Sequence, residues 1–327
     1  MDIYFKEEYA KIYELNGDGK VEKFNFESDD GRAEYIFLKR HVEGETETYY
    51  DITTPYGYGG PVFYPQSPEN LSKLISDFRR EFEVYCKKNK IISEFIRFHP
   101  LLDNHKHLED YLEVTFCHNT ISINLNNEEQ IFSEMSGKAR NKVRKALKNN
   151  VTVKKEYSKE KIKKFIEMYY ETMDKNNASN YYYFDKEYFK NLFELGKDKV
   201  VLFNAYHEED IVAATTILKG RKYIHYHLSA NTKKGYQLAA NNLLLFEVAK
   251  WGGQNGYKNF HLGGGHDGAE DALFKFKSSF NKAGALKFYI GKKVHNPEAY
   301  SSVNEFHERK RPEIKEKDLD FFPLYRR

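Results

Sequence analysis

The residues that decide the fold run from Gly235 to Gly265 and read GYQLAANNLLLFEVAKWGGQNGYKNFHLGGG. Apolar residues crowd the part from about residue 236 to 251, which predicts a buried helix. Glycines then break the helix at three positions, Gly252, Gly253 and Gly256. The segment YKNFHLGGG follows as a short strand that ends in a glycine cluster. This order of helix, break and strand predicts a sheet covered by helices.

The same order of elements occurs earlier in the chain. The strands KFNFES and AEYIFLKRHV flank the turn SDDGR, and the helix PENLSKLISDFRREFEVYCKKN leads into the strand IISEFIRFHPLL. In the second half, VVLFNAYHEEDIVAATTILKG predicts a hairpin before the strand RKYIHYHLSAN and the helix described above. We therefore expect an α/β protein with two similar domains, residues 1–126 and 151–327, each a mixed sheet flanked by helices.

A basic connecting helix is predicted between the two halves, at residues 127–150. Asn127, followed by two acidic residues and Gln130, resembles a capping box. One apolar stripe recurs every four positions: Ile131, Met135, Ala139, Val143 and Leu147. Residues 137–164 contain twelve Lys or Arg and two Glu, a local charge of +10 in a chain of net charge +3. Two interpretations stay open: Arg140 and Arg144 bind phosphates of a polyanion, or the helix face is only solvated.

The composition excludes several classes of protein. Two cysteines, Cys86 and Cys117, give no disulfide framework, and reduced thiols are typical of a cytoplasmic protein. The first residues mix acids with bases, unlike a signal peptide, and no apolar run approaches the ~18 residues that span a bilayer. We expect a cytoplasmic monomer without an integral membrane segment, able to act at the inner surface of a membrane.

Four segments are similar to motifs of the Fem-type aminoacyltransferases, the family that builds peptidoglycan cross-bridges. In chain order they are TPYGYGGP (54–61), KARNKVRKALKNNVTV (138–153), the opening segment 235–265, and LFKFKSSFN (273–281). The resemblance covers nearly the whole chain. It implies two tandem GNAT-type N-acyltransferase domains.

The resemblance also implies a reaction. Family members transfer an amino acid from aminoacyl-tRNA to an amine of a cell-wall precursor, which is either UDP-linked or lipid-linked. No separate cofactor is implied, because the charged tRNA is itself the donor. Such a transfer requires a proton to leave the amine, an oxyanion to be stabilised and a hydroxyl to be protonated. Neither cysteine has the setting of a nucleophile, so direct attack by the amine is expected.

The second half supplies the candidate catalytic residues. Lys277 in FKFKSSF matches the lysine of the family's Phe-Lys motif, where a cation binds donor phosphate or an oxyanion. His227 is a candidate proton shuttle, or else a hydrogen-bonded structural histidine. The glycines after the strand match the family's cluster, where bare backbone lets a substrate approach, and the alternative is a flexible loop: Gly263, Gly264 and Gly265. Three further residues join the substrate-binding set: Tyr226, Asn241 and Phe276, the last of which is otherwise a core aromatic.

The first half supplies candidates for acceptor binding. One loop matches the family's acceptor cleft: Tyr56, Gly57, Tyr58, Gly59 and Gly60. Rings beside glycines suit stacking on a sugar or a uracil, and the alternative is a tight turn with surface tyrosines. Arg97 and His99 lie near a strand end, from which they could reach a diphosphate. The histidines of the second half share no helix at a metal-ligand spacing, so no metal site is predicted.

Two other functions remain open. An acyl-CoA-dependent N-acyltransferase acting on an amino sugar of a surface polysaccharide would have the same fold and acceptor chemistry. Its pyrophosphate loop would be NTKKGYQLAANN, in which Gly235 stands where the acetyltransferase pattern has two or three glycines. The third candidate is a non-catalytic RNA- or glycan-binding module, which the basic helix supports.

Overall fold

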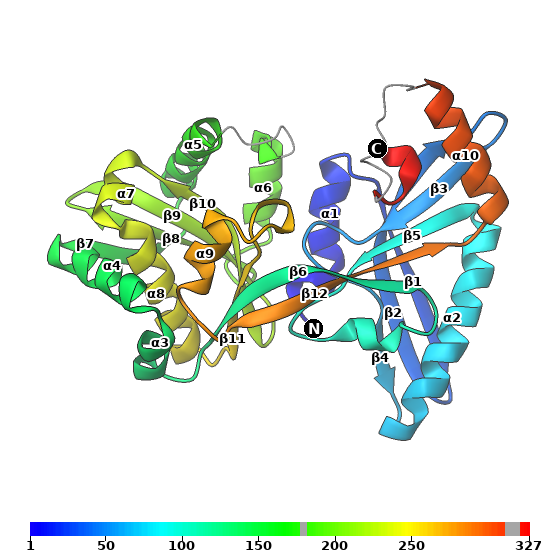
Figure 1. Cartoon of the computed structure of the whole chain (residues 1–327), viewed down its shortest axis with the longest axis horizontal. Coiled ribbons are helices and arrows are strands. Elements are labelled where there is room, and N and C mark those ends of the chain that lie inside the picture. The colour runs from blue at the N-terminus through cyan, green and yellow to red at the C-terminus, as the bar shows by residue number, and fades with distance from the viewer. Residues whose placement is uncertain (177–181, 311–320) are drawn as a thin grey trace. The chain divides into compact units, whose positions relative to one another are not determined.

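The structure, a computed structural model of the whole chain, describes residues 1–176, 182–310 and 321–327. Contacts divide it into two compact units (Figure 1). The central unit comprises Met1–Ile3 and His118–Lys287, and the terminal unit comprises Tyr4–Cys117 and Phe288–Arg327. This division differs from the predicted boundaries. Residues 127–150 lie within the central unit rather than between two domains, and the C-terminal segment belongs to the terminal unit.

Two long strands explain the difference, because each has residues in both units. They are β6 (Glu113–Asn124) and β12 (Ala285–Val294). The C-terminal part of β12 pairs antiparallel with β5 (Ile91–Arg97), so that Ile290 lies opposite Arg97. The last strand predicted for the second half therefore completes the sheet of the first. The assignment of β12 to this sheet depends on pairing between strands that are distant in sequence. A local sequence pattern does not predict such pairing.

The terminal unit is a mixed sheet covered by helices. Its strands follow the order β1-β2-β3-β5-β12, and β4 pairs with β2. Their remaining bounds are β1 (Lys20–Ser28), β2 (Gly31–Glu43), β3 (Thr48–Thr53) and β4 (Val62–Pro65). The helices are α1 (Glu7–Leu15), α2 (Leu71–Lys88) and α10 (Pro297–Lys310). The predicted hairpin around SDDGR is confirmed, since Ser28 pairs with Gly31.

An aromatic core holds the helix α2 against this sheet. Phe78 and Phe82 of α2 are fully buried and pack with Tyr35 and Phe37 of β2. The rings of Phe78 and Phe82 stack with an interplanar angle of 6°. Phe78 and Phe82 are four residues apart and therefore lie on one face of the helix, as the apolar stripe of α2 predicts.

The central unit is also a mixed sheet, with strand order β6-β11-β10-β9-β8-β7. Its further strands are β7 (Val151–Glu156), β8 (Val200–His207), β9 (Asp210–Lys219), β10 (Tyr223–Asn231) and β11 (Asn259–Gly263). Its helices are α3 (Glu128–Glu134), α4 (Gly137–Lys148), α5 (Lys159–Lys175), α6 (Lys186–Glu194), α7 (Lys233–Leu238), α8 (Ala240–Gln254) and α9 (Ala272–Ser278). Nearly every side chain of β8 and β9 is buried, because helices cover both faces of the sheet.

The basic segment forms two helices rather than the single predicted helix. Met135 and Ser136 between α3 and α4 are extended, and the Ser136 hydroxyl accepts a 3.1 Å hydrogen bond from the Ala139 N–H, which starts α4. The predicted cap is present, since the Asn127 side chain accepts from the Gln130 N–H at 2.9 Å. The periodicity places Leu147 on the buried stripe, but this side chain is 52% exposed, and Ala146 is buried in its place.

The helix predicted at about residues 236–251 is also interrupted. Ala239 adopts a left-handed conformation with φ 58° and separates α7 from α8. Gly252 and Gly253 do not end α8, which continues to Gln254. A Cβ at Gly252 would lie 2.8 Å from side-chain atoms of Ile224 and Leu125. These glycines therefore allow close packing of the helix on the sheet instead of breaking it.

Candidate active site

The strands β10 and β11 pair for only three residues. Their parallel register joins Tyr223 to Asn259 and ends where His225 faces His261. Beyond that point β10 continues beside β9, with an irregularity between Tyr226 and Leu228. The end of a parallel strand pair leaves backbone groups free for a ligand, which is where open α/β sheets bind their substrates. Tyr226 and the glycine cluster both follow this point.

Lys277 reaches the same region from α9, which follows β11 in the chain (Figure 1). Its side chain is buried, with 7% exposure, and its Nζ donates a 2.6 Å hydrogen bond to the Gly264 carbonyl oxygen. The same Nζ lies 5.7 Å from the centroid of the Tyr226 ring. Asp271 caps α9 by accepting from the Phe274 N–H at 2.8 Å, which fixes the helix that carries the lysine.

Burial changes the chemistry of this ammonium. It lowers the pKa of Lys277 to about 8, and the nearby negative charge of Asp271 raises it only in part. Among the side chains that the structure describes, no carboxylate lies within ion-pair distance of Nζ. At neutral pH the group is therefore a desolvated, largely charged cation. A cation of this kind stabilises negative charge that develops on an adjacent oxygen.

The glycine cluster makes room for a histidine that the sequence did not single out. A Cβ at Gly264 would lie 2.9 Å from Nε2 and Cδ2 of His118, and one at Gly268 would lie 2.6 Å from its Nδ1. Burial lowers the pKa of His118, and the charge of Lys277 lowers it further. The imidazole is therefore neutral at physiological pH and lies in the electrostatic field of the candidate catalytic lysine.

The other two glycines have different roles. Gly263 has a φ of 75°, and a Cβ at this position would have the Lys277 Nζ as its nearest neighbour, at 3.5 Å. At Gly265 a Cβ would lie 2.0 Å from the Ala269 carbonyl oxygen. The cluster is thus a defined turn around Lys277 and His118, which favours the substrate-site interpretation over a flexible loop.

The two predicted catalytic residues have different surroundings. The His227 Nε2 lies 2.9 Å from the hydroxyl of Tyr188 on α6, whereas Lys277 lies near Tyr226 of β10 and donates to Gly264, which directly follows β11. Burial and the charge of His225 lower the pKa of His227 to about 3. So weak a base has little driving force to accept a proton. The geometry favours the structural alternative for His227.

Three predicted binding residues lie around the lysine or its helix. Burial raises the pKa of Tyr226, and the polar side chains of Ser229 and Asn241 offset part of that shift. The Asn241 Oδ1 is buried and has no hydrogen-bond partner among the described residues. Phe276 is half-buried and packs edge-on against Phe280, with ring centroids 5.3 Å apart. Asn241 therefore offers an unused acceptor, while Phe276 contributes mainly to the core.

The predicted acceptor loop lies in the terminal unit and is tightly packed. Tyr58 lies against Tyr4 and His99, at centroid distances of 5.2 and 5.4 Å. A Cβ at Gly57 would lie 2.3 Å from the Tyr4 ring, and the Gly59 carbonyl accepts from Asn104 at 2.9 Å. Gly60 has a φ of 104°. Tyr56 and Tyr58 are both half-buried, and the ring centroid of Tyr56 lies 6.1 Å from that of Tyr13. The loop is thus a packed turn rather than one with surface tyrosines throughout.

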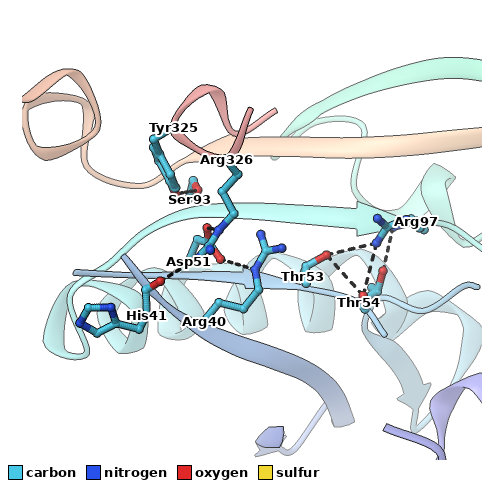
Figure 2. Close-up of polar contacts among 9 residues, drawn as sticks. All are labelled: Arg40, His41, Asp51, Thr53, Thr54, Ser93, Arg97, Tyr325 and Arg326. Carbon is cyan, nitrogen blue, oxygen red and sulfur yellow. Dashed lines mark hydrogen bonds and ion pairs between the residues drawn. The ribbon is translucent and has the colours of Figure 1, made fainter. Parts of the chain in front are cut away.

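Arg97 is the last residue of β5, and His99 follows the strand in the same unit. Figure 2 shows the Arg97 guanidinium turned toward Thr53 and Thr54, and its Nη1 lies 3.2 Å from the Thr53 hydroxyl. His99 is fully buried, and its Nδ1 accepts from the Leu101 N–H at 3.2 Å. Arg97 is half-exposed whereas His99 is buried, so Arg97 is the better placed of the two to meet an anion.

Arg140 and Arg144 lie on α4 in the central unit. The candidates for acceptor binding belong to the terminal unit instead. They line a pocket of about 440 Å³ together with residues of α3. The pocket was not foreseen, because its shape depends on the break between α3 and α4.

His118 and Asp271 are residues of the site that the sequence did not reveal. His118 lies in β6, whose pairing with β11 places Ile121 opposite Gly263. That contact joins positions far apart in the chain, so no local motif reveals it. The cap at Asp271 has a local signal, an aspartate three residues before Phe274 at the start of an amphipathic segment.

Comparison with known proteins supports the fold. A GNAT acetyltransferase domain family matches residues 134–278, and no curated protein matches the chain significantly. The crystal structure of FemX matches with a TM-score of 0.69 and 13% identity, over 92% of this chain and 94% of that one. L-PGS from Bacillus licheniformis matches with a TM-score of 0.54 and 15% identity, over 93% and 97%. The C-terminal domain of a putative lysylphosphatidylglycerol synthetase from Agrobacterium fabrum matches with 0.52 and 12%, over 88% and 87%.

The matched domain contains the strands β7 to β11 and the helix α9 with Lys277. The expectation of two GNAT-like domains, each a mixed sheet flanked by helices, is confirmed. None of the helices in the described part of the chain combines the length and hydropathy that a membrane span requires. The chain therefore has the Fem-like tandem GNAT fold, and its residues 134–278 match the GNAT acetyltransferase domain family.

Proposed function

We propose that the central unit transfers an aminoacyl group from aminoacyl-tRNA to a primary amine of a cell-envelope precursor. The observation that carries this proposal is the position of Lys277 at the end of the β10–β11 pair. A lysine ammonium has three N–H donors, and the Gly264 carbonyl takes one of them. The others remain for an oxygen of the substrate.

The chemistry follows from that arrangement. The acceptor nitrogen attacks the ester carbonyl carbon, and the carbonyl oxygen becomes an oxyanion that Lys277 stabilises. The ester C–O bond then breaks and leaves an amide. The proton lost by the amine ends on the hydroxyl released from the donor. His118 is the candidate to carry this proton, because its neutral imidazole lies beside the same glycine turn.

Asn241 supports an aminoacyl donor over an acetyl donor. Among the described residues its buried Oδ1 has no hydrogen-bond donor, and an unsatisfied buried polar atom costs ~1–3 kcal/mol. An aminoacyl group carries an α-ammonium that can donate to this oxygen, and an acetyl group has no such donor. Binding an aminoacyl group would therefore recover part of that cost.

The segment NTKKGYQLAANN, which forms α7 and the start of α8, also supports charged tRNA over acyl-CoA. The Gly235 N–H donates at 3.0 Å to the Thr232 hydroxyl, so this amide is used inside the protein. A Cβ at Gly235 would lie 2.1 Å from the Val212 carbonyl oxygen. Packing against β9 accounts for this glycine, and no pyrophosphate-binding role is needed to explain it.

The acceptor class is proposed from the Fem-type motifs and from the fold shared with FemX. A UDP-linked peptidoglycan precursor and a lipid-linked one both provide the required amine. The neighbour named lysylphosphatidylglycerol synthetase acts, by its name, on a lipid, which is a reason to test the lipid-linked form as well.

The test is a donor comparison with purified protein. Charged tRNA and acetyl-CoA are supplied separately with UDP-linked or lipid-linked precursor, and new amides are measured by mass spectrometry. We expect product only with charged tRNA. Product with acetyl-CoA alone would instead support the amino-sugar acyltransferase, and absence of product with either donor would contradict the proposed activity.

A further inference from the structure

The helix α4 carries a concentration of uncompensated positive charge. Its basic residues are Lys138, Arg140, Lys142, Arg144, Lys145 and Lys148, and it contains no acidic residue. Among the described side chains, none of these six cations forms an ion pair. Elsewhere the chain pairs many of its lysines, as Lys250 pairs with Glu128 and Glu247. An unpaired row of cations on one helix is an arrangement that attracts a polyanion.

Two of these cations are held in fixed positions. The Arg140 Nη1 donates at 3.0 Å to the Ser133 carbonyl oxygen near the end of α3. The Arg144 Nη1 donates at 3.1 Å to the Asn141 Oδ1, and its guanidinium lies 5.3 Å from the centroid of the Phe132 ring. A guanidinium has five N–H donors, so each group keeps several for a ligand. Positioned in this way, they lose little side-chain entropy when they bind an anion.

Both arginines line the same pocket, of about 440 Å³, between α3 and α4. The other lining residues are Glu129, Phe132, Ser133, Gly137 and Asn141. The volume falls in the range of small-molecule sites and exceeds what a single phosphate needs. Phe132 provides an aromatic surface, and Glu129 is an acceptor for a hydroxyl or amino group. Two guanidinium groups, a ring and a carboxylate match the parts of a nucleotide.

We propose that this pocket binds one nucleotide of a single-stranded RNA, with its phosphate on Arg140 and Arg144 and its base near Phe132. Cationic grooves combined with aromatic rings are the usual way in which proteins hold single strands. The other lysines of α4 lie outside the pocket lining and would add only a general positive field around the strand. The inference rests on the proposed function, because it assigns a binding site to the RNA part of the donor.

A backbone contact connects the pocket to the candidate catalytic lysine. The N–H of Ser136, the residue that caps α4, donates at 2.8 Å to the carbonyl oxygen of Ser279. Ser279 follows the end of α9 and is two residues from Lys277. The pocket and the lysine are thus built on directly connected segments of one unit. An RNA strand in the pocket would have its acylated end free to extend toward Lys277.

The test measures the affinity of the protein for a labelled single-stranded RNA of about ten nucleotides. Fluorescence anisotropy gives this affinity at a series of salt concentrations. The variant Arg140→Gln/Arg144→Gln removes both pocket cations. The matched control Lys145→Gln/Lys148→Gln removes the same charge from the same helix outside the pocket lining. We expect the arginine variant to lower the log–log salt slope by about 1.4, ~0.7 for each lost phosphate contact, and to weaken binding far more than the control.

Phe132→Leu separates a nucleotide site from a plain anion site. It should weaken RNA binding while leaving competition by inorganic phosphate unchanged. Equal losses for the arginine variant and its control would overturn the pocket and leave only a general positive field. Competition by free CoA that depends on the same arginines would show a coenzyme site instead.

Failure of the pocket proposal can be distinguished from failure of the proposed function. Transfer from charged tRNA by wild type, together with unchanged RNA binding by the arginine variant, would overturn the pocket and keep the function. Arginine-dependent RNA binding without any transfer would support the pocket and overturn the function. Thermal melting of every variant checks that the fold is intact.

Discussion

Lys277 is a buried ammonium whose protonation decides whether it can stabilise an oxyanion. Burial lowers its pKa from 10.5 to about 8, and the titratable groups described around it include Asp271, His118 and Tyr226. Because the charged form predominates below that pKa, its contribution is nearly complete at pH 7. The contribution disappears as pH rises through about 8, well before an ordinary lysine would deprotonate.

This predicts a specific pH dependence of transfer. The acceptor amine also gains reactivity as pH rises, so the wild type is compared with Lys277→Arg, whose guanidinium stays charged. The ratio of wild-type turnover to that of the arginine variant should fall between pH 7 and 9. A ratio that stays constant up to pH 10 would show that the lysine charge does not limit the reaction.

Gly264 provides a second prediction at this scale. A methyl group there would lie 2.9 Å from the His118 ring, in a packed turn. Gly264→Ala should therefore cost ~1–3 kcal/mol of unfolding free energy, the usual range for overpacking, and should reduce transfer by displacing the imidazole. Urea denaturation measures the first effect.

The matched control is Gly137→Ala. No atom lies within 4 Å of a Cβ built at Gly137, which starts α4, so this variant should be neutral or slightly stabilising. If both alanine variants are equally stable, the glycine cluster is not a packed turn around His118.

At the scale of elements, local patterns predicted most helices and strands but misplaced several ends. The hairpin around HEED and the apolar face of α2 followed from residue periodicity. The break at Ser136 and the left-handed Ala239 did not, because a helix-forming pattern continues across both positions. Serine and alanine are compatible with a helix interior as well as with its end, and only the packing of α3, α4 and α8 decides between them.

A buried carboxylate joins β2, β3 and the C-terminal residues of the terminal unit. Asp51 of β3 is fully buried and accepts hydrogen bonds of 2.6 Å from Nε of both Arg40 and Arg326 (Figure 2). The Arg326 Nη2 also donates at 2.8 Å to the His41 carbonyl oxygen. The Ser93 and Tyr325 hydroxyls lie 2.7 Å apart beside this cluster. The last residues of the chain are thus part of the sheet's polar network.

Asp51→Asn should release that segment. The change removes the negative charge and leaves two guanidinium groups unpaired, at a cost of order 3 kcal/mol. Hydrogen exchange should increase in β2, β3 and residues 321–327. Asp77→Asn, which affects an ion pair with the exposed Lys73 and Arg80, should change stability by less than ~1 kcal/mol. Equal exchange in the two variants would contradict the proposed role of Asp51.

At the scale of the whole molecule, the two units have separate cores. The cluster around α8 in the central unit and the cluster around α2 in the terminal unit share no residue. The sequence predicted two similar halves but divided them at the wrong kind of feature, a helix instead of the strands β6 and β12. Long-range strand pairing was not visible in the sequence, and the same pairing kept His118 from being recognised as a candidate residue.

The candidate site was predictable to the extent that it follows a local motif. Lys277 and the three glycines of 263–265 were found because they lie within twenty residues of one another. Arg140 and Arg144 were found through charge density alone, without the pocket that holds them. His227 shows the limit of such reasoning. From sequence, a histidine on a strand near the site can be a proton shuttle or a structural residue. Its contact with Tyr188 in the structure favours the structural role.

The central claim is that the charge of Lys277 acts in acyl transfer. The most direct test compares the turnover of Lys277→Met and Lys275→Met with charged tRNA and an amine acceptor. Lys275 is exposed on the same helix two residues away, so both variants lose one positive charge and keep similar volume. We predict a loss of ~10²–10³ in turnover for Lys277→Met with little change in melting temperature, and a near-normal rate for Lys275→Met. Equal, mild losses in both variants would contradict the account.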